Sequence, residues 1–95
     1  MPASPLPRPP ITVSIVSHGQ LGLILPLLEQ LSRHCAHVIA RVVLTLNIPE
    51  PDLLAGRTWR IPLTRIDNAR AQGFGANHNA AFAKDAALGA SDWFL

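Results

Sequence analysis

The pattern of apolar and polar positions predicts alternating strands and helices. Residues 11–17 (ITVSIVS) alternate between apolar and polar side chains, as a short strand does. Residues 38–46 contain Val42-Val43-Leu44, which is apolar on both faces and typical of a parallel strand covered on both sides. Between these strands, apolar residues recur with the spacing of an amphipathic helix that ends around residues 32–36: Leu21, Ile24, Leu25, Leu28 and Leu31. Pro26 falls in or near the first turns of this helix, where a missing N–H is tolerated best.

The second half of the chain predicts the same order of elements. Pro49 and Pro51 end the second strand, and residues 53–57 are predicted to form a short helical turn. Residues 59–66 contain Pro62, so we expect a short or edge strand there. A loop over 68–75, an alanine-rich helix over 76–88 with a C-terminal glycine, and a strand beginning at 92–95 follow. This order predicts an α/β fold, a doubly wound parallel sheet in three α/β/α layers.

Length and composition limit the domain organisation. The chain has 95 residues, of which 48% are hydrophobic and 15% charged, enough for one small domain over 11–95. Residues 1–10 hold five of the nine prolines, which predicts a flexible, extended arm. The single cysteine, Cys35, excludes a disulfide framework and is expected to pack as a small hydrophobe near a helix end.

Charge and hydropathy exclude several partners. The net charge is only +2, and the basic residues are scattered rather than clustered, so we expect no nucleic-acid surface. The longest apolar stretch, residues 21–28, is interrupted by Gly22 and Pro26 and is far shorter than the roughly 20 residues of a membrane span. No secretory signal is recognisable, and a lone thiol is compatible with a reducing compartment, so the cytoplasm is the expected location.

Polar residues follow each predicted strand. Ser17 and His18 come at the end of the first strand, Asn47 follows the second, and Asp67 and Asn68 follow the third. The carboxyl ends of parallel strands meet at one edge of the sheet, where open α/β sheets bind ligands. These positions predict a binding crevice, and ordinary polar loop residues are the alternative.

A glycine-rich segment precedes the second helix. Gly73 and Gly75 allow close approach of a ligand, and a helix N-terminus offers free N–H groups to an anion such as a diphosphate. The glycine spacing matches neither the dinucleotide fingerprint nor the P-loop, so a structural loop and a ligand loop fit the glycines equally well. Asn77 and Asn79 favour capping or ligand contact. The four histidines lack acidic partners at ligand spacing, so we predict no metal site.

These segments together resemble the N-terminal half of a family 2 glycosyltransferase of the inverting GT-A type. The strongest match is the stretch from Asn68 to Phe82, which contains GFGANHN and is similar to the family's Asn-x-Gly-Phe-Gly-Ala-Gly-x-Asn segment. The segment 13–19 (VSIVSHG) resembles the first strand of the family, and LLEQL at 27–31 resembles its first helix. Residues 92–95 (DWFL) resemble the strand that leads into the family's Asn-Pro-Asp metal motif.

The resemblance implies a Rossmann-like GT-A half-domain that binds a nucleotide-diphospho-sugar. The nucleotide-sugar pocket would be lined by Ser17, His18, Asn47, Asn68, Gly73, Phe74, Gly75, Asn77 and Asn79. The family's acidic base-contacting stretch reads Leu46-Asn47-Ile48-Pro49-Glu50 here, which departs from the family pattern. The acceptor would be a saccharide or a lipid-linked group, and the full-length protein could be membrane-peripheral.

The resemblance also implies a divalent cation, Mg²⁺ or Mn²⁺, that stabilises the diphosphate leaving group. The metal-binding aspartate and the catalytic base of the family would both follow Leu95, so we expect a truncated unit that is inactive by itself. The alternative is a non-catalytic α/β module that self-associates through an exposed sheet edge. A dinucleotide-binding oxidoreductase is disfavoured because the glycines lie in the second βα turn rather than the first.

Overall fold

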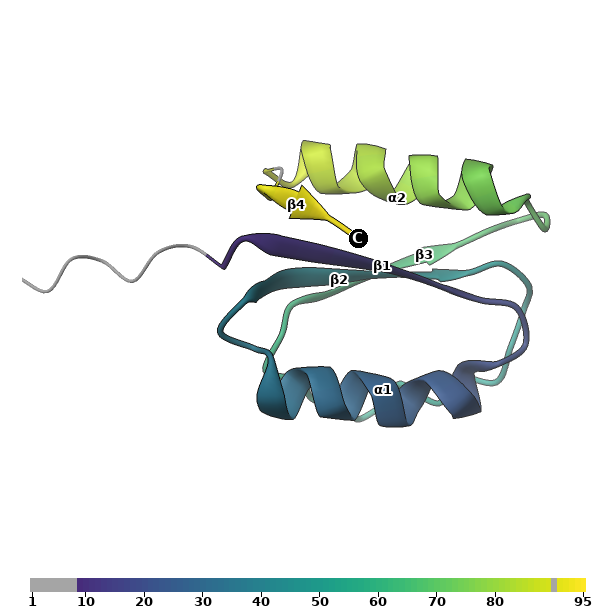
Figure 1. The fold of residues 1–95 in the computed structure, drawn as a ribbon. Coiled ribbons are helices and arrows are strands. Elements are labelled where there is room, and N and C mark those ends of the chain that lie inside the picture. Colours follow the sequence, from purple (N-terminus) through teal and green to yellow (C-terminus); the bar gives the residue numbers. More distant parts are fainter. Residues whose placement is uncertain (1–8, 90) are drawn as a thin grey trace, which may run out of the picture.

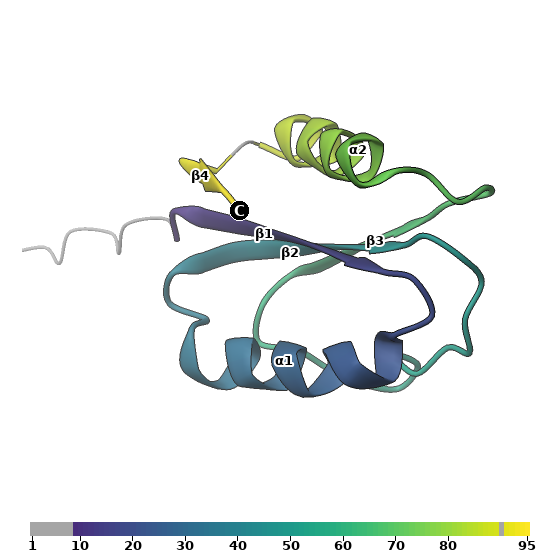
Figure 2. The same ribbon diagram turned by 45° about the vertical axis from the view of Figure 1, so that its right-hand side comes forward.

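A four-stranded, all-parallel sheet forms the middle layer of the molecule (Figure 1). The computed structural model describes residues 9–89 and 91–95. The elements are β1 (Ile11–Ser17), α1 (Leu21–His34), β2 (Ile39–Leu46), β3 (Leu63–Asp67), α2 (Phe74–Ala87) and β4 (Trp93–Phe94). The strand order is β3-β2-β1-β4, and α1 and α2 cover opposite faces of the sheet (Figures 1 and 2). The predicted α/β class with a parallel sheet is therefore confirmed, and the layout is consistent with a Rossmann-like arrangement.

The hydrophobic core lies between α1 and the sheet. The buried apolar residues of this layer are Leu21, Leu25, Leu28, Ile39, Val42, Leu44, Leu46 and Ile61. The next residue of β2, Val43, is fully buried on the opposite face, which confirms that this strand is covered on both sides. Cys35 is a free, half-buried thiol packed against this core, as predicted. Among the residues described, neither helix is long and apolar enough to cross a membrane.

Pro26 lies near the start of α1, as predicted. The helix begins at Leu21, so the proline occupies its second turn. A proline there lacks the N–H that would bond to the carbonyl of Gly22, four residues earlier. Both residues are exposed, so water can satisfy that carbonyl and the helix continues to His34.

The contact of α2 with the sheet is small and polar. The helix turns Asn77, Ala81 and Asp85 toward the sheet at four-residue intervals, and all three are buried. The helix begins two residues before the predicted start, so Phe74 and Gly75 belong to its first turn and the prediction that places them in a loop is wrong. Gly89 follows the helix with φ +96°, a left-handed conformation that fits the predicted C-terminal glycine.

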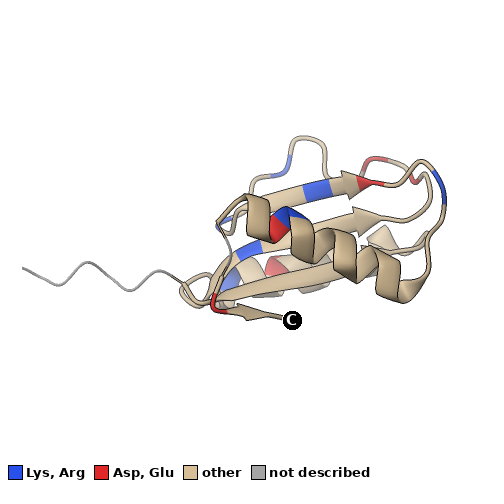
Figure 3. Ribbon diagram, turned by 90° about the horizontal axis from the view of Figure 1, so that it is seen from above, with Lys and Arg blue, Asp and Glu red and all other residues tan. Residues whose placement is uncertain are grey.

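The two edges of the sheet differ in character. At one edge, β3 begins at Leu63 rather than at 59, and it carries charged residues of both signs (Figure 3). Arg65 Nε forms an ion pair with Asp67 at 3.0 Å. Pairing of β3 starts only after Pro62, whose carbonyl accepts a 2.9 Å bond from Val42 N–H. At the other edge, β4 is short and apolar, and Trp93 is 66% exposed. Trp93 therefore does not pack in a core of the described residues, whereas its neighbour Phe94 contacts Phe82 of α2 edge-on.

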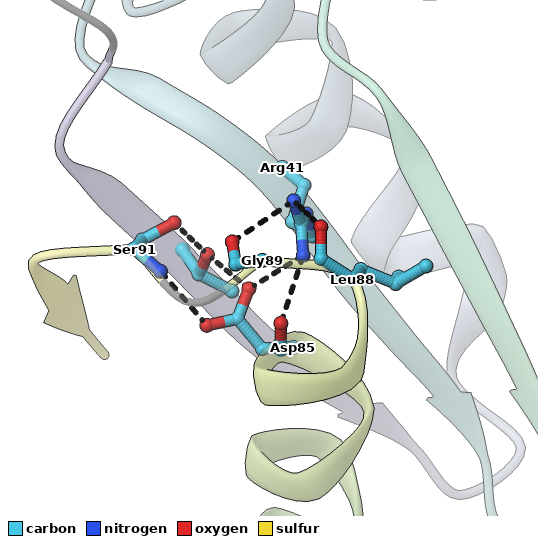
Figure 4. A network of polar contacts seen from close by, with 6 residues as sticks. Arg41, Asp85, Leu88, Gly89 and Ser91 are labelled. Carbon is cyan, nitrogen blue, oxygen red and sulfur yellow. Dashed lines mark hydrogen bonds and ion pairs between the residues drawn. The ribbon is translucent and has the colours of Figure 1, made fainter.

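A buried ion pair fastens the end of α2 to the sheet (Figure 4). Arg41 Nη1 of β2 lies 3.0 Å from Asp85 Oδ1, and the same oxygen accepts a 2.7 Å hydrogen bond from Thr12 Oγ1 of β1. The other carboxylate oxygen accepts a bond from the backbone N–H of Ser91 at 3.3 Å. Arg41 also donates to the carbonyls of Leu88 and Gly89, so one guanidinium satisfies the C-terminal end of the helix.

The proline-rich segment predicted for residues 1–10 lies largely outside the described residues. Within the described part, the Pro10 carbonyl accepts a 2.9 Å hydrogen bond from the backbone N–H of Trp93. The end of that segment is therefore fixed against β4.

Candidate functional site

A groove opens at the carboxyl ends of the strands, where the chain changes from one face of the sheet to the other. The connection from β1 to β2 runs through α1 on one face, and α2 leads to β4 on the other face (Figure 1). Such a switch point is where open α/β sheets bind ligands. The groove has a volume of about 570 Å³ and is lined by residues 14–16 of β1 together with His18, Asn47, Gln72, Phe74, Asn77 and His78.

Three asparagines from separate segments meet beneath this groove. Asn68 Nδ2 donates to Asn47 Oδ1 at 2.9 Å and to Asn77 Oδ1 at 2.6 Å. Asn47 follows β2, Asn68 follows β3 and Asn77 lies in the first turns of α2. The structure thus brings together three of the residues that the sequence placed at the site.

The role of these asparagines is to hold a loop. Asn47 Oδ1 accepts a bond from Gln72 N–H at 2.7 Å, and Asn47 Nδ2 donates to the Gln72 carbonyl at 3.1 Å. Asn77 Nδ2 donates to that same carbonyl at 3.3 Å. Because the amide of Asn47 is buried and engaged on both sides, its role is to shape the groove.

The fixed amide of Asn47 also sets the tautomer of His18. The two Gln72 backbone bonds determine which end of the Asn47 amide is nitrogen, and that nitrogen lies 3.1 Å from His18 Nδ1. An NH₂ group donates, so Nδ1 accepts and the proton of the neutral imidazole is on Nε2. His18 is exposed at the groove and therefore supplies an N–H donor there.

Ser17 lies on the other side of this edge, under the N-terminus of α1. Its side chain is fully buried, and its hydroxyl donates to Glu50 Oε2 at 2.5 Å while it accepts from Gln20 N–H. Neighbouring strand residues point to opposite faces, which separates Ser17 from His18. The structure therefore places Ser17 in the support of α1 and not in the lining of the groove.

Glu50 completes the N-terminus of α1. Its Oε1 accepts a 2.9 Å bond from Leu21 N–H, the first residue of the helix. Burial opposes ionisation of Glu50, but hydrogen bonds from Ser17 and from the backbone N–H groups of Leu21 and Gly19, together with the nearby His18, leave its pKa below the usual value. The sequence analysis did not identify this role. The signal available was an acidic residue three positions after Asn47, between two prolines.

The N-terminus of α2 is different because no side chain caps it. Gly73 is the N-terminal cap residue, and the first turn contains no acidic residue. Neither Gly73 nor Gly75 has a positive φ, and an added Cβ at either position meets nothing within 4 Å. Phe74 is 81% exposed, and Asn79 is also exposed on α2. Of the predicted site residues, Gly73, Gly75 and Asn79 lie near the groove without lining it.

Ser14 and His78 form a pair in the groove that the sequence analysis missed. Ser14 Oγ lies 2.8 Å from His78 Nδ1, and the ring of Phe74 contacts that of His78 edge-on at 4.4 Å. A serine 64 positions away in the chain gave no sequence signal for this contact. The pair fixes the imidazole of His78 between β1 and α2.

The divalent cation implied by the resemblance has no donor set among residues 9–89 and 91–95. No group of three or more His, Cys, Asp or Glu side chains there could hold a metal ion. The acidic residues at and after the ends of β3 and β2, Asp67 and Glu50, are engaged with Arg65 and Ser17. No chemical step is therefore assigned to a metal on these residues.

Comparison with known proteins gives no relative: no family model, no curated protein and no solved structure matches the chain.

Proposed function

We propose that this chain is the nucleotide-sugar-binding part of a family 2-type glycosyltransferase with a GT-A fold, which transfers a sugar from a nucleotide-diphospho-sugar to an acceptor hydroxyl. The observation that carries the proposal is the groove at the switch point, beside the GFGANHN segment that resembles the family. The asparagine network beneath it fixes the Gln72 loop and so keeps the groove in a defined shape.

The two helix N-termini at this edge favour a diphosphate at α2. Glu50 places a carboxylate at the first N–H of α1, which disfavours a second anion there. The first turn of α2 has neither an acidic residue nor a side-chain cap, and it adjoins the groove. Gly73 and Gly75 leave open space along this turn for phosphate oxygens. The Glu50 carboxylate at the N-terminus of α1 also argues against a dinucleotide site in the first βα turn.

The remaining groove residues suit the nucleoside. His18 offers its Nε2–H to a ribose hydroxyl or a base carbonyl, and the exposed ring of Phe74 offers a face for stacking. These residues bind and orient the donor. Deprotonation of the acceptor, a saccharide or a lipid-linked hydroxyl, is not assigned to any described residue.

Two-dimensional amide NMR of the chain, titrated with uridine, thymidine and guanosine diphosphates and their sugar conjugates, tests the proposal. We expect one of these ligands to shift the amide signals of His18, Gln72, Phe74 and His78 saturably. A dissociation constant in the millimolar range still supports the proposal. His18→Ala and Phe74→Ala should weaken the effect. The matched controls His34→Ala and Phe82→Ala, which remove an exposed histidine and an exposed phenylalanine outside the groove, should not. Absence of saturable shifts with the whole panel refutes the proposal.

Self-association is the second candidate, and the β4 edge favours it. Trp93 and Leu95 are exposed there, and no charged residue lies within β4, in contrast to Arg65 and Asp67 on β3. A second copy of the chain could pair with this edge and cover its apolar side chains. Light scattering over a concentration series should then show a dimer that Trp93→Lys disrupts. A strict monomer at all concentrations rules this candidate out.

A further inference from the structure

A second hollow lies on the opposite face of the sheet from the groove. It has a volume of about 490 Å³ and is formed by the C-terminal half of α1 and the segment 57–60 that leads to β3. This end of α1 lies away from the carboxyl ends of the strands, where the groove opens (Figure 1). The hollow is therefore independent of the nucleotide site.

Two contacts give this hollow a fixed shape. The side chain of Trp59 packs against the hydrophobic core between α1 and β3, which anchors the 57–60 segment. The buried hydroxyl of Ser32, on α1, accepts a 2.8 Å hydrogen bond from the backbone N–H of Arg60. Trp59 and the backbone of Arg60 are thus held against the helix and the core.

The hollow carries an excess of guanidinium groups. It is lined by Arg33, Arg57 and Arg60 against a single carboxylate, that of Glu29, so three positive charges minus one negative charge leave +2. Arg57 Nη1 pairs with Glu29 at 3.0 Å and its Nε donates to the Leu53 carbonyl. Within the described residues, no carboxylate lies within ion-pair distance of Arg33 or Arg60.

We propose that this hollow is a binding site for a phosphate group, held by Arg33 and Arg60. A guanidinium binds phosphate oxygens through two parallel N–H donors, and two such groups match the charge of a phosphate monoester. The charge of Arg57 is paired with Glu29, so Arg57 lines the site without supplying a free positive charge. Ser32 and Trp59 act as positioning residues, because Ser32 bonds to the backbone of Arg60 and Trp59 anchors the segment on the core.

Titration with inorganic phosphate tests the site, followed through the amide signals of residues 58–60 and the Nε–H signals of the arginines. Sodium chloride at equal ionic strength serves as the salt control. We expect saturable shifts with phosphate alone, and Arg33→Gln or Arg60→Gln should each weaken binding about tenfold. Lys84→Gln removes the same charge from α2, on the other face, and should leave binding unchanged. Equal shifts with chloride, or equal weakening in Lys84→Gln, overturn the proposal.

A second arm identifies the source of the phosphate. The chain is sedimented with phosphatidylcholine vesicles that contain or lack phosphatidic acid. Binding to the acidic vesicles that is lost in Arg33→Gln identifies a lipid headgroup, whereas phosphate binding without vesicle binding identifies a soluble ligand. Failure in both arms excludes a phosphate site. Ser32→Ala distinguishes positioning from charge, because it should weaken phosphate binding without changing the net charge.

Discussion

Arg41 on β2 and Asp85 on α2 form a 3.0 Å ion pair in which the carboxylate side chain is only 2% exposed. Asp85→Ala leaves the guanidinium without its counter-ion and Thr12 Oγ1 without its acceptor. Breaking a buried pair by removing one partner lowers the free energy of unfolding by about 3–5 kcal/mol. Urea denaturation followed by circular dichroism measures this loss.

The matched control is the exposed pair on β3. Asp67→Ala removes a carboxylate that is 3.0 Å from Arg65, but this carboxylate is largely exposed to water. Exposed pairs contribute about 0–1 kcal/mol to stability, so this variant should unfold close to the wild-type urea midpoint. Equal losses in the two variants would show that burial of Asp85 has no energetic consequence.

Two buried threonines should respond in opposite ways to replacement by valine. Thr45 Oγ1 is buried without a hydrogen-bond partner among the residues described, whereas Thr12 Oγ1 donates to Asp85. Thr45→Val removes an unsatisfied hydroxyl and should raise the free energy of unfolding by about 1 kcal/mol. Thr12→Val should lower it by about 1–3 kcal/mol. Thermal melts of both variants provide the comparison, and stabilisation by both would contradict the assignment.

Asn47 should matter for the shape of the groove more than any exposed asparagine. Asn47→Ala removes the acceptor of Gln72 N–H and the partner of Asn68, and leaves buried groups without hydrogen bonds. We expect a loss of about 1–3 kcal/mol and displaced amide signals at Gln72. Asn79→Ala, on the exposed side of α2, should leave both unchanged. If Asn47→Ala leaves the Gln72 signal in place, the network does not hold the loop.

Glu50 should make stability depend on pH in the acidic range. Its pKa in the folded chain lies below its ordinary value of 4.5. The stabilisation from its ionised form is therefore complete above pH 4.5 and disappears as the pH falls through the lower, folded pKa. Glu50→Gln should lack this contribution, so its free energy of unfolding should be lower than wild type at neutral pH and converge with it in acid. A difference that stays constant with pH excludes this explanation, and Glu29→Gln serves as the exposed control.

The layers of the fold could be predicted because they follow from local pattern. The buried side chains of a strand or helix recur at a regular spacing, which can be read from the sequence. This holds for the alternation in 11–17, the leucine spacing in α1 and the apolar run in β2. The start of β3 could not be predicted from Trp59 and Ile61, because these apolar residues pack on the core from an irregular segment. The exposure of Trp93 could not be predicted either, since it depends on strand order, which places β4 at an edge.

For the site, the sequence placed residues at the correct edge but did not give their roles. Asn47, Asn68 and Asn77 were all selected, and they do converge, because strand ends in a parallel sheet meet at one edge. Their bonding to each other rather than outward depends on side-chain geometry. Ser17 and Glu50 pair across 33 positions, and Ser14 and His78 across 64, and no local pattern encodes such contacts.

The polar contact of α2 with the sheet has a consequence for how the molecule opens. The buried face of α2 consists of only Asn77, Ala81 and Asp85, whereas α1 is held by the whole leucine-rich core. We therefore expect α2 to exchange its amide hydrogens for deuterium as a separate cooperative unit, before α1 does. The groove is lined by both β1 and α2, so a molecule bound there contacts the stable sheet and also the helix that opens first. Slower exchange in α2 alone would then report occupancy of the groove, without any change in the protection of α1.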